Sequence, residues 1–150
     1  MEREPDIDVF EEQAELPIAG APVGAAELGA IFAGGFLGAL ARAGLEQALD
    51  VAPESWPWPT FAVNMLAAAL LGYAIAWLGS HHPRTMRARA FLATGVCGAL
   101  STFSTVMVEL IHLDERAGLG PAAGYGAASI AGGLAAVALG VRLGSRRGPA

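Results

Sequence analysis

Four long apolar runs, separated by short polar patches, constrain the fold of this sequence more than any other feature. The runs cover about residues 28–49, 59–79, 90–108 and 119–141. Each is close to the ~20 residues that a helix needs to cross the hydrocarbon core of a bilayer. Hydrophobic residues make up 54% of the chain and charged residues only 15%. The sequence therefore predicts an all-α membrane protein with four transmembrane helices.

The first 25 residues differ from the rest, because seven of the fourteen acidic residues fall within the first fifteen positions. This stretch has three prolines and no sustained hydrophobic period. We expect a disordered acidic extension over residues 1–25, or alternatively a short surface helix over residues 9–16. Its acidic start is unlike that of a cleavable signal peptide. The membrane domain is expected over residues 26–145, followed by a basic tail at 146–150.

Arginines are distributed unequally between the polar segments. The second connection carries Arg84, Arg87 and Arg89, and three more arginines lie at the C-terminal end, whereas the first and third connections together have only Arg116. Because cytoplasmic loops are enriched in Lys and Arg, both termini are expected in the cytoplasm. The sequence thus predicts a multi-pass protein of the cell inner or plasma membrane.

The third apolar run has an interior that is unusual for a membrane-spanning helix. Residues 95–105 read GVCGALSTFST, and glycine and hydroxyl residues are poor helix formers. One explanation is that the hydroxyls bond back to carbonyls of their own helix. The other is a helix broken near its middle, which survives in lipid only where the unwound backbone is buried in protein or lines a cavity. Broken helices of the second kind coordinate ions.

Other polar side chains lie on or beside the apolar runs, where they are costly and often functional. Each also has a structural explanation. Arg42 could snorkel to the interface, Asn64 could form an interhelical hydrogen bond, and Glu109 could be a solvated carboxylate near a helix end. The single cysteine, Cys97, has neither a disulfide partner nor metal-ligand spacing, so we expect it to be a packing residue.

Three motifs, in the right order, resemble signatures of the CrcB/Fluc family of fluoride channels. The segment GGFLGALAR at 34–42 is similar to the family's GGxxGAxxR, and TFAVN at 60–64 to its TFxVN. The run at 95–105 is similar to its G-x-C-G-G-x-T-T-F-S-T break. Tyr125 and Ser129 match the family's Y-x-x-x-S pattern in the last helix.

The resemblance implies an antiparallel dimer with two narrow pores, through which fluoride leaves the cytoplasm passively. Amide and hydroxyl donors, together with the positive edges of phenylalanine rings, would hold the anion. The pathway residues that the resemblance implies are Arg42, Asn64, Phe103, Ser104, Thr105, Glu109 and Tyr125. It also implies a structural sodium ion, Na+, bound by the backbone carbonyls of Gly98 and Ser101 from both subunits.

Within that implied pathway, Asn64 is the amide donor, Phe103 is the ring-edge contact, and Arg42 lies near the pore mouth. Gly34 and Gly38 have GxxxG spacing, which lets helix backbones approach closely. We expect these two glycines to serve the subunit interface.

Besides Ala99 and Ser101, which replace the usual Gly and Thr, the chain departs from the family in two ways that matter more. Val106 follows Ser104-Thr105 where family members usually have a second phenylalanine, so this subunit should lack one fluoride contact. Single-gene members insert both ways and need balanced loop charges, whereas here six arginines lie on one side and one on the other. We therefore expect a heterodimer with an oppositely oriented homologous subunit that supplies the missing phenylalanine.

Two alternatives belong to other functional classes. A small multidrug-resistance-type proton-coupled exporter needs a central carboxylate in the first run, where the sequence has only Glu27 at the edge. A poorly conducting assembly subunit of a fluoride-channel heterodimer would account for Val106. No nucleophile is arranged with a base, so we expect no enzyme, and no basic stripe suggests nucleic acid. The expected partners are fluoride, membrane lipid and the homologous subunit.

Overall fold

The computed structural model describes residues 23–49, 56–81 and 86–146. Four helical segments in this part of the chain are long and apolar enough to cross a membrane. They are α2 (Ala25–Ala48), α3 (Trp58–His81), a compound third span (Met86–Ala117) and α7 (Leu119–Ser145). The predicted all-α, four-span fold is confirmed. The expected acidic extension lies outside the described residues, except for residues 23–25, and so does most of the basic tail.

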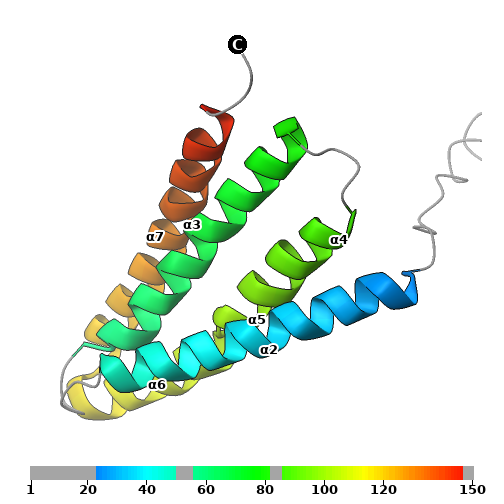
Figure 1. Cartoon of the computed structure of the whole chain (residues 1–150). Helices are drawn as coiled ribbons and strands as arrows, with labels where there is room; N and C mark the ends of the chain where they lie inside the picture. Colours follow the sequence, from blue (N-terminus) through cyan, green and yellow to red (C-terminus); the bar gives the residue numbers. More distant parts are fainter. Residues whose placement is uncertain (1–22, 50–55, 82–85, 147–150) are drawn as a thin grey trace, which may run out of the picture.

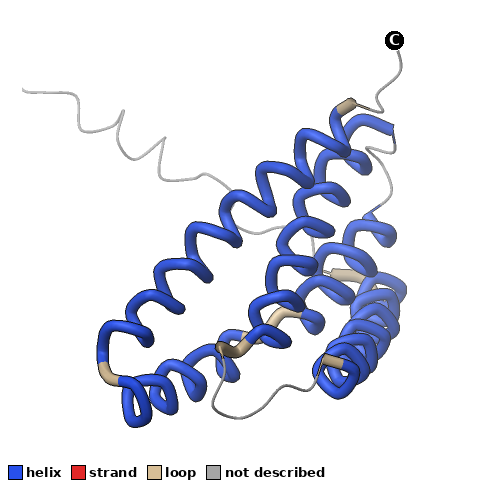
Figure 2. Tube along the Cα trace, turned by 90° about the vertical axis from the view of Figure 1, so that its left-hand side faces the viewer, coloured by secondary structure: helices blue, strands red, loops and turns tan. Residues whose placement is uncertain are grey.

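The third span consists of several helical pieces. It begins with α4 (Met86–Arg89), continues as the π-helix η1 (Ala90–Cys97) and α5 (Gly98–Leu100), and resumes as α6 (Phe103–Ala117). Between α5 and α6 the backbone is extended, with φ/ψ of −74°/151° at Ser101 and −140°/119° at Thr102. Figure 2 shows this break as a loop between two helices. The predicted discontinuity near the middle of the third span is confirmed.

The helices form two pairs that diverge from a common end (Figure 1). In one pair α3 packs along α7, and in the other α2 packs along η1 and α5. The pairs meet where α2 approaches the start of α3 and where α6 leads into α7. We call this the loop-one end, because α2 ends and α3 begins there. At this end α6 packs against α7 and joins the two pairs.

Glycines allow the α2–η1 pair to pack backbone against backbone. Gly34 and Gly38 are buried, and a Cβ on either would overlap a carbonyl oxygen of η1, that of Phe91 or of Val96 respectively. Gly95 faces them from η1, and a Cβ on Gly95 would lie only 2.8 Å from the carbonyl oxygen of Ile31, which is too close. The prediction that Gly34 and Gly38 serve a subunit interface is therefore wrong, because they pack within this chain.

The polar stretch after the third run is still helical. α6 continues to Ala117 and ends at Gly118, whose φ of 85° is a conformation that glycine adopts most readily. The Gly118 N–H donates to the carbonyl of Asp114 (2.9 Å), and α7 begins at the next residue. Glu109 therefore lies in the middle of α6, and the interpretation that placed it near a helix end is wrong.

Candidate ion pathway

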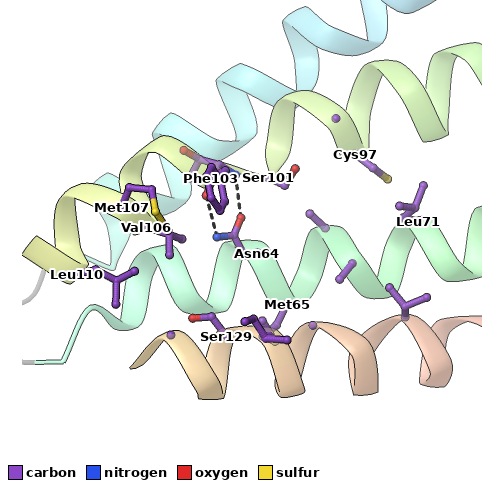
Figure 3. A pocket seen from close by; sticks show the side chains of 18 of the residues that line it. Asn64, Met65, Leu71, Cys97, Ser101, Phe103, Val106, Met107, Leu110 and Ser129 are labelled. Carbon is purple, nitrogen blue, oxygen red and sulfur yellow. Dashed lines mark hydrogen bonds between the residues drawn. The ribbon is translucent and has the colours of Figure 1, made fainter. Parts of the chain in front are cut away.

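Asn64 binds the backbone of the break from the neighbouring helix. Its side-chain amide donates from Nδ2 to the carbonyl of Thr102 (3.1 Å) and accepts at Oδ1 from the Thr102 N–H (2.8 Å). Figure 3 shows the side chain extending from α3 to the break, with both hydrogen bonds drawn. A carboxamide is suited to this role, because it carries one donor and one acceptor side by side. The interhelical hydrogen bond expected of Asn64 is thus present and is doubled.

Thr102 caps the helix that follows the break. Its hydroxyl accepts from the Thr105 N–H (3.3 Å), as an N-cap side chain does, and lies 2.9 Å from the Thr105 hydroxyl. The Ser104 hydroxyl is 3.4 Å from the same oxygen. The Thr102 hydroxyl therefore bonds to the following turn of helix and not back to a preceding carbonyl, as one of the two explanations had it. Ser104 and Thr105 instead belong to a small hydroxyl cluster at the start of α6.

The side chains of Asn64 and Thr102 leave two backbone carbonyl groups without their helical hydrogen bonds. In a continuous α-helix, the N–H of residue i+4 bonds the carbonyl of residue i. The Thr102 N–H, which would bond Gly98, goes to Asn64, and the Thr105 N–H, which would bond Ser101, goes to the Thr102 hydroxyl. The carbonyls of Gly98 and Ser101 thus lose the partners that an unbroken helix would supply. Both residues are exposed in the single chain.

A cavity of about 490 Å³ lies beside the break, lined by α3, the pieces of the third span and α7. Most of its lining is apolar. The polar groups at its wall include Asn64, Ser101, Thr102 and Ser129. Phe103 and Val106 also line it, from the first turn of α6 (Figure 3). Among the residues implied for fluoride or sodium, this cavity brings together Asn64, Gly98, Ser101 and Phe103.

A second polar group ties three helices together toward the loop-one end. The Glu109 carboxylate accepts from the Thr60 hydroxyl at Oε1 and from the Tyr125 hydroxyl at Oε2, both at 2.6 Å. Thr60 and Tyr125 are 2% and 0% exposed, so both donors are withdrawn from solvent. Hydrogen bonds to an ionised acceptor are short and strong. The solvated carboxylate proposed as an alternative for Glu109 is therefore wrong.

Sequence reasoning assigned no role to Thr60, although it begins the TFAVN motif. It lies four residues before Asn64, so a helix places both on one face. That spacing could have identified Thr60 as a residue of the candidate site.

The remaining residues differ in how the single chain presents them. Arg42 is half-buried on α2, which contributes nothing to the lining of the 490 Å³ cavity. This chain alone therefore does not bring Arg42 to the other residues implied for the pathway.

Phe103 is 76% exposed, whereas Val106, one turn further along α6, is 8% exposed. The ring of Phe103 therefore faces outward from this chain, and Val106 occupies the inward position. Cys97 is buried and lines the cavity, in agreement with a packing role.

Comparisons with known proteins agree with these motifs. Residues 29–141 match the family model described as CrcB-like protein, Camphor Resistance (CrcB). The Fluoride-specific ion channel FluC 1 of Mycolicibacterium paratuberculosis (strain ATCC BAA-968 / K-10) is 50% identical over 117 residues, which cover 78% of this chain and 89% of the relative.

Two further relatives carry related names. The Fluoride-specific ion channel FluC 1 of Mycobacterium tuberculosis (strain CDC 1551 / Oshkosh) is 50% identical over 113 residues, covering 75% of this chain and 86% of its own length. The Fluoride-specific ion channel FluC of Xanthomonas oryzae pv. oryzae (strain MAFF 311018) is 40% identical over 114 residues, covering 76% and 84%.

Proposed function

This chain belongs to the CrcB family, and we propose that it forms one subunit of a channel that lets fluoride cross the membrane passively and so lowers cytoplasmic fluoride. The observation that carries the proposal is the break in the third span, where Asn64, a hydroxyl cluster and Phe103 meet beside one cavity. A small, strongly hydrated anion needs donors to replace its water. The break supplies those donors inside an otherwise apolar protein.

The anion would meet two kinds of positive contact. The second N–H of the Asn64 carboxamide is not needed for Thr102 and can point into the cavity that Asn64 lines. Phe103 can offer a ring edge, which carries the positive part of the aromatic quadrupole. Ser104 and Thr105 add hydroxyl groups beside that of Thr102 at the start of α6.

Glu109 would regulate access to the next donors. Its carboxylate already holds the hydroxyls of Thr60 and Tyr125, as an anion in transit would. Fluoride can use those hydroxyls only when the Glu109 carboxylate turns away from them. We therefore assign Thr60, Glu109 and Tyr125 to the pathway beyond the cavity, with Arg42 near a mouth that the assembled channel would complete.

We also propose that the freed carbonyls of Gly98 and Ser101 hold the structural sodium ion. The residues fit this role, because carbonyl oxygens suit a hard cation and a helix C-terminus carries a partial negative charge. Nothing lies within 4 Å of a Cβ built on Gly98, so the backbone is accessible from that side. Two carbonyls from one chain leave a cation short of ligands, so a second subunit would supply the rest. Bound sodium would fix the two breaks against each other.

Fluoride efflux from liposomes, read with a fluoride electrode, tests the function. We expect the purified channel, reconstituted with its partner subunit, to release fluoride from the liposomes. Liposomes that lack protein should retain it. Phe103→Leu should lower the flux roughly two- to tenfold, since a favourable ring contact contributes about 0.5–1.5 kcal/mol. Cys97→Ala, which changes a cavity residue without a donor or ring, is the matched control and should conduct normally. No efflux from the co-expressed pair would refute the channel.

We propose further that the channel is a heterodimer. The outward-facing Phe103 and the exposed residues Gly98 and Ser101 at the break form a surface that a second subunit can complete. The bias of arginines favours a partner of opposite orientation.

Expression of this chain alone tests the heterodimer. We expect the lone chain to yield no fluoride-conducting dimers, while co-expression with a homologue of reversed loop charge restores conduction. Conduction by the lone chain would contradict a heterodimer but leave the channel itself intact. If the pair conducts equally with and without the partner's phenylalanine that corresponds to Val106, the idea that the partner supplies the missing contact fails.

A further inference from the structure

Trp56 lies at the loop-one end of the polar residues, two positions before α3 begins. A short turn positions it, in which the Trp58 N–H donates to the Trp56 carbonyl (2.7 Å) and the Phe61 N–H donates to that of Pro57 (3.1 Å). The indole meets the ring of Tyr125 edge-on, with centroids 5.3 Å apart and an interplanar angle of 86°. The indole ring of Trp56 thus packs against a residue that is 0% exposed.

The indole N–H of Trp56 has no acceptor among the described residues. Its Nε1 atom is buried, and no described residue accepts a hydrogen bond from it. An indole nitrogen can only donate, and the N–H of a buried tryptophan usually finds a partner. A buried donor without an acceptor is costly, so one in a protein with few polar groups points to a ligand that arrives from outside the chain.

The ring of Trp56 continues the path that the polar residues define. Ser129 lines the cavity, Tyr125 lies one turn earlier on α7, and Trp56 covers the Tyr125 ring. Tyr125 in turn donates to Glu109 (2.6 Å). The Trp56 indole thus lies against the ring of the residue whose hydroxyl contacts Glu109, and no described residue accepts a hydrogen bond from its N–H.

We propose that Trp56 is a further anion contact of the pathway, with its indole N–H donating to fluoride at the loop-one end. This inference rests on the proposed channel function and adds a residue to it. The N–H replaces part of the hydration that the anion has lost, at the point where it enters or leaves. Trp58 serves as the internal comparison, because its ring is 6.1 Å from that of Trp56 but is 57% exposed and packs on Phe61.

Three variants of the reconstituted pair test this contact by fluoride efflux. Trp56→Phe keeps an aromatic ring against Tyr125 but has no N–H, and we expect the flux to fall roughly tenfold, as for the loss of one hydrogen bond to a charged group. Trp56→His returns a ring N–H and should recover part of the flux. Trp58→Phe should conduct as the unmodified pair does. Size-exclusion profiles of all variants should match that of the unmodified pair.

The outcomes separate this inference from the channel function. If the unmodified pair releases no fluoride, the proposed function fails. If the unmodified pair conducts and Trp56→Phe matches it, or if Trp56→His conducts no better than Trp56→Phe, the indole N–H is not an anion contact. A fall of equal size in Trp58→Phe would likewise overturn the proposal, since it would assign the effect to general packing of the aromatic cluster.

Discussion

Replacing Asn64 by leucine is expected to abolish fluoride conduction. The substitution removes both hydrogen bonds that the Asn64 side chain makes to the backbone of Thr102. Thr102 is only 6% exposed, so its backbone N–H and carbonyl would be left buried without those bonds. Each buried unpaired group costs about 1–3 kcal/mol. We expect the efflux rate to fall by at least about a hundredfold, because a loss of this size corresponds to two or more factors of ten.

The reason for so large an effect is that Asn64 acts on the break as a whole. Without it, the Thr102 N–H can return to the carbonyl of Gly98 and continue the α-helix of α5. The proposed cation ligand and the anion donor would then be lost together. Met65→Leu is the matched control, since Met65 lines the same cavity and makes no described hydrogen bond. Conduction by Asn64→Leu within twofold of the unmodified pair would contradict this account.

Gly38→Ala is expected to destabilise the folded subunit strongly. The new Cβ would overlap the carbonyl oxygen of Val96, which belongs to backbone and cannot rotate away. Overpacking of this kind costs about 1–3 kcal/mol, and the backbone contact places Gly38 at the upper end. Thermal unfolding in detergent, followed by size exclusion after heating, would measure the loss.

Gly29→Ala is the control for that experiment. Nothing lies within 4 Å of a Cβ at Gly29, which is on the same helix. Because alanine is a better helix former than glycine by about 1 kcal/mol, Gly29→Ala should be neutral or slightly stabilising. Equal stability of the two variants would show that α2 and η1 do not pack as closely as the structure has them.

The four spans and the break were predictable from sequence, for different reasons. Span length and the scarcity of charge within each run reflect the bilayer directly, so they need no knowledge of packing. The break at Ser101 and Thr102 was indicated by residue types that a membrane helix interior avoids. The family resemblance, carried by three motifs, is confirmed by the match over residues 29–141.

Other features depend on contacts that no local pattern encodes. The π-helix over Ala90–Cys97 packs along α2, and its sequence AFLATGVC does not distinguish i+5 from i+4 bonding. The spacing of Gly34 and Gly38 predicted a close helix contact correctly but could not say with which helix. Glu109 was misplaced because a cluster of charges suggests an exit from the membrane, whereas α6 remains helical to its glycine.

The single-residue connection at Gly118 bears on how the chain enters the membrane. It makes α6 and α7 a tight helical hairpin, in which Glu109 and Tyr125 are separated by sixteen residues. An ionised side chain costs about 2.5–3.5 kcal/mol at the centre of an inserting helix. During synthesis, Glu109 can gain the Tyr125 hydroxyl as soon as the hairpin closes. The Tyr125 hydroxyl, which donates to Glu109 in the folded subunit, would thus also ease the insertion of that carboxylate.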